Sequence, residues 1–473
     1  MASIFLANAP YCLEERYGKL ASIGATLPCL GLLMLGAGLR RAGHRVRIVD
    51  ASAQCISSEN ILEEIKKFLP DVIGLTAVTP SIIKTAKLAS TIKISYPSIP
   101  ILIGGPHFTA VPHKTLTDCR AFDYGIIGEG EQTVIDIIEA LSAGRIPSDV
   151  QGIVFRKNGK VCFAPPRLPI KNLDALPFPA WDLLDGFPFR YHPALFKYKR
   201  LPSTHIISAR GCPNKCIFCD TSVFSGQIRF HSPEYIWEMV NYLVKNFKIK
   251  EIIFEDDQFL IKKERVEKIC RGFLRANWSI SWCCSGRASS VNDLSLLRLM
   301  KRAGCWQISY GIESGNQKIL NFAKKAIRID QIEKAVRLTH KAGILAKGYF
   351  ILGLPHETEQ TIRNTIRFAK SIPLHDISVF TLTPFPGSRM FDIAEQHGTI
   401  VKDFEKMNLL EVVYVPRGLS KSKLLDYQRL FMKQFYLRPR IIGNYAVRLL
   451  ENPMNILNMG KGFSGFFRHV FKV

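Results

Sequence analysis

The apolar residues up to about position 145 form short continuous runs, separated by amphipathic segments of helical length. The runs occupy 4–7, 46–49, 72–77 and 101–103, and the helical patterns occupy 30–41, 59–68 and 82–95. Short apolar strands that alternate with helices are typical of a parallel sheet covered on both faces. We therefore expect an α/β, doubly wound (Rossmann-like) domain over residues 1–145.

A second alternation begins at residue 201 and repeats six times. Strands are expected over 205–208, 251–255, 281–285, 307–312, 346–352 and 377–382, and helical patterns lie between them at 233–246, 263–275, 293–303, 316–322, 330–342 and 359–371. Repeated strand-helix units imply parallel strands with right-handed crossovers. This pattern predicts a partial (β/α)6 barrel over residues 201–400, with chemistry at the carboxyl ends of its strands.

The two remaining segments have a different composition. Residues 146–200 contain several prolines, including Pro165, Pro166 and Pro169, and are predicted to be a linker because proline interrupts regular elements. Residues 401–473 hold 13 Lys or Arg against five Asp or Glu, and are expected to form a basic, mainly helical C-terminal extension.

Composition narrows the class of protein. The chain has 473 residues and a formal charge of +24, with 47% hydrophobic residues, which is ordinary for a globular protein. Its longest strongly apolar stretch, 27–39, is shorter than the roughly 20 residues of a membrane span. The N-terminus lacks the charged region and cleavage site of a signal peptide, so we expect a cytoplasmic protein.

Twelve cysteines in a reducing compartment should be thiols or metal ligands. Nine of them lie among apolar neighbours and are expected to be small buried side chains. These nine are Cys12, Cys29, Cys55, Cys119, Cys162, Cys270, Cys283, Cys284 and Cys305.

The other three cysteines, Cys212, Cys216 and Cys219, follow the first expected barrel strand at spacings of four and three. A zinc site would need a fourth ligand, and the sequence places His205 in a strand before the loop and His231 twelve residues after it. A cubane iron-sulfur cluster can be held by three cysteines, which leaves one iron open. The spacing therefore favours such a cluster.

With Phe218 before its last cysteine, this loop resembles the CxxxCxxC signature of the radical S-adenosylmethionine (SAM) superfamily. Companion segments at the ends of later strands fit the same resemblance. They are 255–257, 311–315, 348–355 and 383–388.

Three loops of the first domain, 74–80, 104–109 and 128–131, resemble the cobalamin-binding domain of class B radical SAM enzymes. That group includes corrinoid-dependent methyltransferases and the anaerobic Mg-protoporphyrin monomethyl ester cyclase. The resemblance implies cobalamin contacts from Thr76, Thr79, Gly104, Gly105, His107, Gly128, Glu129 and Gly130. No Asp-x-His-x-x-Gly motif occurs, which implies a corrin held without a protein imidazole.

The resemblance also implies that the three cysteines bind a 4Fe–4S cluster whose open iron chelates SAM. The residues expected at SAM are Phe218, Glu255, Asp256, Arg287, Glu313, Ser314, Phe350 and Ile351. The acidic residues and Ser314 would receive the ammonium or ribose, the apolar residues would pack on adenine, and Arg287 would pair with the carboxylate. The alternative role for the carboxylates is to cap the following helices.

The function implied is reductive cleavage of SAM and, with cobalamin, methylation of an unactivated carbon of a hydrophobic metabolite. Oxygen-independent cyclisation or rearrangement of a tetrapyrrole or lipid is the alternative. Two further classes are an RNA-modifying radical SAM enzyme and a non-enzymatic corrinoid sensor. The cysteine triplet argues against the sensor, and the absence of a recognisable RNA-binding pattern argues against RNA.

The expected partners are a flavodoxin or ferredoxin as reductant and a hydrophobic substrate, and the chain is expected to be a monomer. Residues 461–472 interleave four phenylalanines with cations. Such a segment can lie on anionic lipid at the inner face of a membrane, or it can form a terminal helix packed on the barrel.

Overall fold

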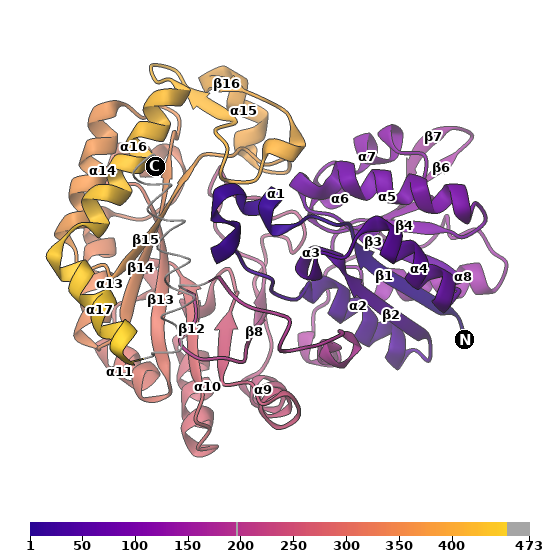
Figure 1. Ribbon diagram of the computed structural model, residues 1–473, viewed down its shortest axis with the longest axis horizontal. Helices are drawn as coiled ribbons and strands as arrows, with labels where there is room; N and C mark the ends of the chain where they lie inside the picture. The colour runs from indigo at the N-terminus through magenta and orange to yellow at the C-terminus, as the bar shows by residue number, and fades with distance from the viewer. Residues whose placement is uncertain (195–196, 452–473) are drawn as a thin grey trace.

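The computed structural model describes residues 1–194 and 197–451 and contains two large sheets that lie side by side (Figure 1). The first sheet has seven strands in the order β2-β1-β3-β4-β5-β6-β7. Their bounds are β1 Ser3–Asn8, β2 Arg45–Asp50, β3 Val72–Thr76, β4 Ile101–Gly104, β5 Tyr124–Ile126, β6 Ile153–Lys157 and β7 Lys160–Phe163. The pairs from β2 through β5 are parallel, as the strand-helix alternation predicts.

Helices cover both faces of the first sheet. Successive residues of β1 point to opposite sides, so Leu6 packs in one apolar cluster with α2 and α8, whereas Phe5 packs in another with α4, α5 and α7. The helices are α1 Leu13–Tyr17, α2 Leu30–Arg41, α3 Ala51–Gln54, α4 Ser58–Phe68, α5 Ile82–Ser95, α6 Pro106–Ala110, α7 Pro112–Asp118 and α8 Glu131–Ser142. This burial on both faces explains the continuous apolar runs and confirms the doubly wound fold.

The segment 146–200 differs from the predicted linker. Within this segment, strands β6 and β7 form a hairpin that adds two antiparallel strands to the first sheet. The turn is Asn158-Gly159, and both residues have positive φ, of 51° and 76°, which suits a two-residue hairpin turn. The expectation of a linker is therefore wrong for 153–163, where a hairpin signal outweighs the proline content of the flanking residues.

The second sheet is a six-stranded parallel open barrel with the order β15-β14-β13-β12-β11-β8. All six predicted strands are present. Their bounds are β8 Ser203–Ile206, β11 Glu251–Phe254, β12 Ser281–Gly286, β13 Cys305–Glu313, β14 Leu345–Leu352 and β15 Asp376–Thr381. Between β8 and β11, the short strands β9 Ala209–Arg210 and β10 Arg229–Phe230 pair with each other.

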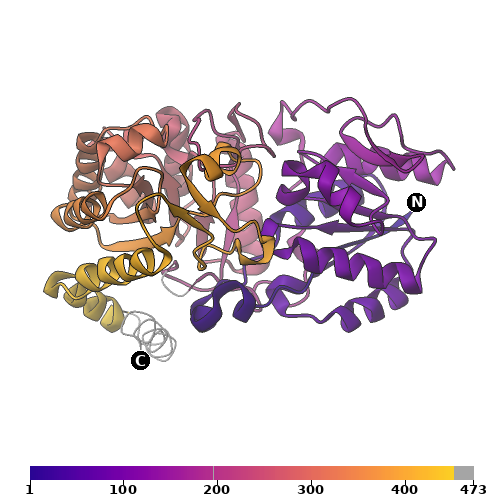
Figure 2. The ribbon, with the colours of Figure 1, turned by 90° about the horizontal axis from the view of Figure 1, so that it is seen from above.

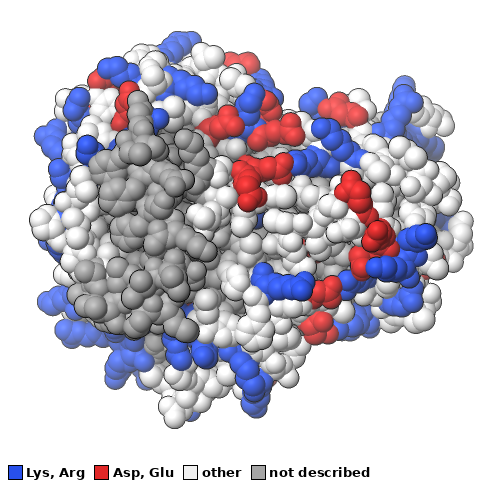
Figure 3. All heavy atoms as spheres, viewed as in Figure 1, with Lys and Arg blue, Asp and Glu red and all other residues white. Residues whose placement is uncertain are grey.

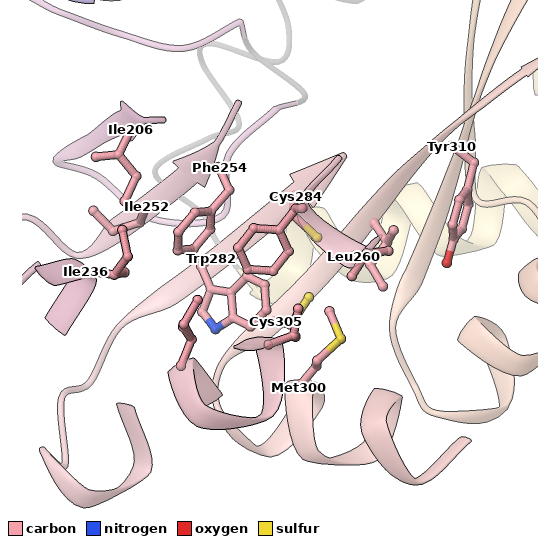
Figure 4. Packing of buried hydrophobic residues seen from close by; sticks show 14 of the residues in the cluster. Ile206, Ile236, Ile252, Phe254, Leu260, Trp282, Cys284, Met300, Cys305 and Tyr310 are labelled. Atoms are coloured by element: carbon pink, nitrogen blue, oxygen red, sulfur yellow. The ribbon is translucent and has the colours of Figure 1, made fainter. Parts of the chain in front are cut away.

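The helices of the second domain follow its strands around the outside, as the view from above shows (Figure 2). They are α9 Pro233–Phe247, α10 Lys263–Arg275, α11 Leu294–Arg302, α12 Gln317–Phe322, α13 Ile329–Lys341, α14 Glu359–Ser371 and α15 Arg389–His397. The outward face of the sheet forms the core beneath them (Figure 4). There Phe254 meets Trp282 edge to face, with ring centroids 5.5 Å apart, a favourable aromatic geometry.

The scattered cysteines mostly pack as expected. Five of them are buried: Cys119, Cys270, Cys283, Cys284 and Cys305. Cys284 and Cys305 are seen in Figure 4 among apolar side chains. Cys12, Cys29 and Cys162 are half-buried. Cys55 is exposed, so the expectation is wrong for this residue, which ends α3 in a left-handed conformation.

The C-terminal extension begins with the antiparallel pair β16 Gly398–Ile400 and β17 Tyr414–Pro416, followed by α16 Lys421–Tyr436 and α17 Pro439–Glu451. Helix α16 is part of the barrel wall, because Phe431 is fully buried with its ring centroid 4.9 Å from that of Phe350. The predicted amphipathic segment 461–472 lies outside the described residues. Within the described part of the chain, no helix is both long and apolar enough to cross a membrane.

Removal of the Phe431 ring should destabilise the second domain. Phe431→Ala is expected to lower the free energy of unfolding by about 3–5 kcal/mol, because a buried phenylalanine leaves both lost contacts and a cavity. Anaerobic urea unfolding of the whole chain measures this change. Leu437→Ala, at an exposed position after the same helix, should shift stability by less than about 0.5 kcal/mol. Equal effects of the two variants would contradict the role of α16.

Candidate functional site

A cavity of about 670 Å³ lies between the two domains. One wall comes from the carboxyl ends of β1, β3, β4 and β5 and from the start of α2. The opposite wall comes from residues of the second domain, among them His205, Arg210 and Phe224. Ligands of parallel α/β sheets bind outside the carboxyl ends of the strands, which is where this cavity lies.

The first-domain wall includes glycines at positions where a side chain would collide with neighbouring backbone or would be strained. Gly105 has φ +94°, and a Cβ there would lie 2.4 Å from Thr76 Oγ1 and 2.9 Å from the carbonyl oxygen of Ala77. Gly128 also has a positive φ, of +73°. Glycine at position 105 lets the loops that follow β3 and β4 pack closely together, so backbone forms this part of the wall, which suits a ligand with a large flat face such as a corrin.

Six of the eight residues predicted for cobalamin line the cavity: Thr76, Gly104, Gly105, Gly128, Glu129 and Gly130. The loops that carry the resemblance thus meet at one edge of the sheet. Their residues fit the cofactor that the resemblance implies.

The prediction is wrong for the other two residues, Thr79 and His107. Helix α6 turns the chain away from the cavity, so His107 is buried with its Nδ1 3.2 Å from Thr79 Oγ1. The His107 ring also packs edge to face against Phe404 of the C-terminal extension, with centroids 4.9 Å apart. Burial lowers the pKa of His107 to about 4. This histidine joins the extension to the first domain.

Several cavity residues were not predicted from the sequence. Lys197, in the segment before β8, lines the cavity and pairs with Glu255. The Lys197 Nζ lies 3.0 Å from the Glu255 Oε1. The His205 Nε2 lies 2.9 Å from the Pro28 carbonyl, and the His231 Nδ1 lies 3.1 Å from Asp174. No local motif marks these residues, because chain segments far apart in the sequence bring them together.

The three predicted metal ligands lie on the loop between β9 and β10. Its middle is fixed by two backbone hydrogen bonds, from Ile217 N to Ala323 O at 3.1 Å and from Met390 N to Ile217 O at 2.7 Å. Asn214 Nδ2 and Gln258 Nε2 donate to Cys212 Sγ at 3.2 and 3.5 Å. N–H donors around sulfur favour the anionic thiolate that binds metal.

Burial and the neighbouring acidic groups determine the charge of Cys219. Burial raises the pKa of Cys219 to about 12, and Asp257 and the thiols of Cys216 and Cys212 add to this effect. The Cys219 thiol therefore stays protonated unless a cationic group, such as the irons of a cluster, binds beside it. In the residues that the structure describes, no three side chains converge as ligands of a single ion. Cluster ligands stand farther apart, because each thiolate binds a different iron.

Four of the residues predicted for SAM gather around this loop. Arg287 Nη1 lies 3.7 Å from Cys216 Sγ, and its Nη2 donates to Ala326 O at 3.0 Å. Phe218 and Ile351 border one apolar cluster. Glu313 is buried and pairs with Lys325 at 2.6 Å, and the Lys325 ammonium lies 5.7 Å from the Phe218 ring centroid. We therefore retain these four as candidates for SAM.

Two other residues predicted for SAM, Asp256 and Ser314, make hydrogen bonds to protein groups. Asp256 is buried and accepts from the Ser208 N–H at 2.5 Å and from the Ser208 hydroxyl. Burial raises its pKa to about 6, although Arg265 and the hydrogen bonds of Ser208 oppose this. Ser314 Oγ lies 3.1 Å from Thr365 Oγ1 of α14.

Phe350 points to the outer face of the sheet, against Phe431. Adjacent strand residues face opposite sides, so Ile351 and Phe350 cannot share a ligand. The expectation of SAM contact is wrong for Phe350, whereas Asp256 and Ser314 have protein partners and stay predictions. Glu255 faces Lys197, and its burial is outweighed by that cation, which holds the pKa of Glu255 below its usual value.

Gly105→Ala should weaken binding of hydroxocobalamin by at least about tenfold, because the new methyl group collides with Thr76 and Ala77 at the cavity wall. Absorbance titration measures the affinity. Gly43→Ala is the matched control: Gly43 also has a positive φ, of +85°, but its Cβ would meet open space. An equal loss in both variants would show general backbone strain rather than a cavity effect.

Cys216→Ala should abolish the absorbance of the reconstituted cluster and the cleavage of SAM, because the loop loses one of its three thiolates. Cys270→Ala, at a buried position in α10, should leave both intact. Iron content and anaerobic absorbance check the first effect. A fully loaded Cys216→Ala protein would contradict the assignment.

Comparisons with known proteins agree with this geometry. The family model of the radical SAM superfamily matches residues 206–369, and that of the B12 binding domain matches residues 18–138. An uncharacterised methyltransferase of Pyrococcus horikoshii is 34% identical over 425 residues, which cover 89% of this chain and 90% of that protein. The anaerobic magnesium-protoporphyrin IX monomethyl ester cyclase of Rubrivivax gelatinosus is 29% identical over 431 residues, covering 88% and 76%.

Among solved structures, the cobalamin-dependent SAM radical enzyme OxsB with aqua-cobalamin and SAM bound superposes with a TM-score of 0.75. The match covers 98% of this chain and 72% of that one at 18% identity, and confirms the fold. The family models and the 34% identity to the Pyrococcus protein over 89% of this chain show which family this is. The chain belongs to the radical SAM superfamily, within its B12-binding group, and is an enzyme whose cofactors are a 4Fe–4S cluster, SAM and cobalamin.

Proposed function

We propose that the protein methylates an unactivated carbon of a hydrophobic metabolite. The observation that carries this proposal is the position of the cavity. Its first-domain wall carries the predicted cobalamin residues, and its second-domain wall includes Arg210, which is only two residues from Cys212. A cobalamin in this cavity would therefore lie beside the cysteine loop, as transfer of a methyl group from SAM requires.

The residues around the loop divide the work of holding SAM. When bound, the cluster supplies the electron that cleaves SAM to methionine and a 5'-deoxyadenosyl radical, and cobalamin supplies the methyl carrier. Cys212, Cys216 and Cys219 would hold the cluster, and the Arg287 guanidinium would pair with the SAM carboxylate. Phe218 and Ile351 would exclude water from the adenine side, and Glu313 would face the ammonium or ribose.

The substrate is proposed to be apolar, such as a lipid or tetrapyrrole. The cyclase relative is named for a tetrapyrrole ester, which supports this class. The inner face of the barrel also offers aromatic surface, where Tyr349 and Phe380 lie with ring centroids 6.4 Å apart. Oxidative cyclisation is the second candidate, favoured by the same relative.

The surface gives less support to an RNA substrate. On the face shown in Figure 3, Lys and Arg are scattered over both halves and interspersed with Asp and Glu, whereas a nucleic-acid site usually has a continuous basic stripe. The proposal places the enzyme in the cytoplasm as a monomer, with a flavodoxin or ferredoxin as reductant. Contact with an anionic membrane through the C-terminal residues also belongs to this proposal.

The products of SAM distinguish the candidate reactions. One SAM that gives up its methyl group yields S-adenosylhomocysteine, and another that is cleaved reductively yields 5'-deoxyadenosine after it takes a hydrogen atom from the substrate. Protein reconstituted anaerobically with iron, sulfide and hydroxocobalamin, and supplied with SAM and a strong reductant, should form both products. Mass spectrometry measures them. Without added substrate, the 5'-deoxyadenosyl radical takes its hydrogen atom from the protein or the medium.

Formation of 5'-deoxyadenosine alone would favour cyclisation or rearrangement over methylation. Formation of neither product by fully loaded protein would contradict the proposed function.

A further inference from the structure

Four charged side chains are buried together where the two domains meet. Arg229 contacts both oxygens of Glu129, with Nη2 2.7 Å from Oε1 and Nη1 2.9 Å from Oε2. Arg210 lies 2.6 Å from Glu131 and 3.3 Å from Glu129. The four side chains are only 5–10% exposed. Two positive and two negative charges thus balance away from solvent.

The two arginines close the loop that carries the cysteines. Arg210 and Arg229 pair directly across the short antiparallel strands β9 and β10, so everything from 211 to 228, including the cysteine triplet, lies between them. Like charges directly opposite each other in a β-pair are destabilising. The closure of this loop therefore depends on the carboxylates supplied by the other domain.

The two glutamates belong to the wall of the cobalamin cavity. Glu129 lies in the turn that starts at Gly128 after β5, Glu131 is the first residue of α8, and all three residues line the cavity. Glu129 is further fixed by the Ile170 N–H, which donates to its Oε2 at 2.7 Å. Burial raises the pKa of Glu129, but the guanidiniums of Arg229 and Arg210 outweigh it, so the carboxylate stays ionised.

The loop itself also reaches the cavity. Phe224 lies five residues after Cys219 and lines the cavity, its carbonyl accepts from Arg229 Nη2 at 3.1 Å, and its ring lies 5.3 Å from the Arg210 guanidinium carbon. A shift of either arginine would therefore move the cysteine loop relative to the cavity wall. The same four charges determine the position of both.

We propose that Arg210, Arg229, Glu129 and Glu131 are positioning residues that hold the cysteine loop at a fixed distance from the cobalamin cavity, and so determine how efficiently a methyl group passes from SAM to cobalamin. This inference rests on the proposed function. It differs from a general stabilising role, because it predicts that each cofactor site works alone while transfer between the sites fails.

The test compares wild type with Arg229→Gln and Arg229→Lys. Arg229 is not among the residues that line the cavity. Arg229→Gln removes its charge and its two contacts with Glu129, and Arg229→Lys keeps the charge but loses the two-point contact. Arg47→Gln is the matched control, because Arg47 also contacts two carboxylates, at 2.9 Å from Glu64 and 2.6 Å from Asp185, but belongs to β2, away from the cysteine loop.

Three quantities are measured in each reconstituted protein. They are the affinity for hydroxocobalamin, the formation of 5'-deoxyadenosine in protein without cobalamin, and the formation of S-adenosylhomocysteine with cobalamin and reductant. In Arg229→Gln the first two should stay close to wild type, and the third should fall by ~100-fold, the typical effect of a misplacement of about 1 Å. In Arg229→Lys the formation of S-adenosylhomocysteine should lie between that of wild type and that of the glutamine variant. Arg47→Gln should match wild type in all three quantities.

Pulsed electron paramagnetic resonance gives a second readout that does not depend on turnover. It measures the distance between the reduced cluster and Co(II) cobalamin, which should be sharply defined in wild type and broadened or lengthened in Arg229→Gln. An unchanged distance with unchanged S-adenosylhomocysteine would overturn the inference, as would a parallel loss of all three quantities. If wild type forms no S-adenosylhomocysteine, the proposed methyl transfer fails, while the distance still tests the positioning role.

Discussion

The parallel arrangement of both large sheets is the constraint on which the site depends. In a parallel sheet the loops that follow the strands all emerge at the same edge. The carboxyl ends of β3, β4 and β5 supply one wall of the cavity, and the segment after β8 supplies part of the opposite wall. Because the two edges face each other, two cofactor sites from separate domains can share one interior.

Several charged side chains at the domain junction and inside the barrel are paired. Besides the arginine-glutamate cluster, Lys325 meets Glu313, Lys197 meets Glu255, and Lys347 meets Asp376 at 2.8 Å. An isolated buried charge is costly, whereas a paired one fixes geometry at a smaller cost. Since each of these pairs is neutral, the formal net charge of +24 comes from other residues.

The strands and the cysteine loop could be predicted from the sequence because their signals are local. A strand buried on both faces needs a continuous apolar run, and three thiols on one loop need only their spacing. The hairpin 153–163 was missed, although its Asn158-Gly159 turn is also a local signal. The direction of Phe350 depends on which face of β14 is covered by α16, some 80 residues later in the chain, and no local pattern carries that information.

Side-chain partners that come from distant segments were the least predictable. Asp256 and Ser314 end barrel strands, as a SAM ligand would, but Ser208 and Thr365 already occupy them. Lys197 and Arg229 carry no motif at all, and their roles follow only from the carboxylates that face them. Sequence patterns thus located the edges that form the site, and tertiary contacts decided which side chains turn toward it.

The central claim is that the cysteine loop binds a cluster with one iron left open for SAM. Electron paramagnetic resonance of the reduced, fully reconstituted protein tests it most directly, with spectra recorded before and after addition of SAM. The account predicts a shift of the cluster signal on addition, since SAM would become a ligand of the open iron. A spectrum unchanged by excess SAM, or a loop that takes up zinc in place of iron and sulfide, would contradict it.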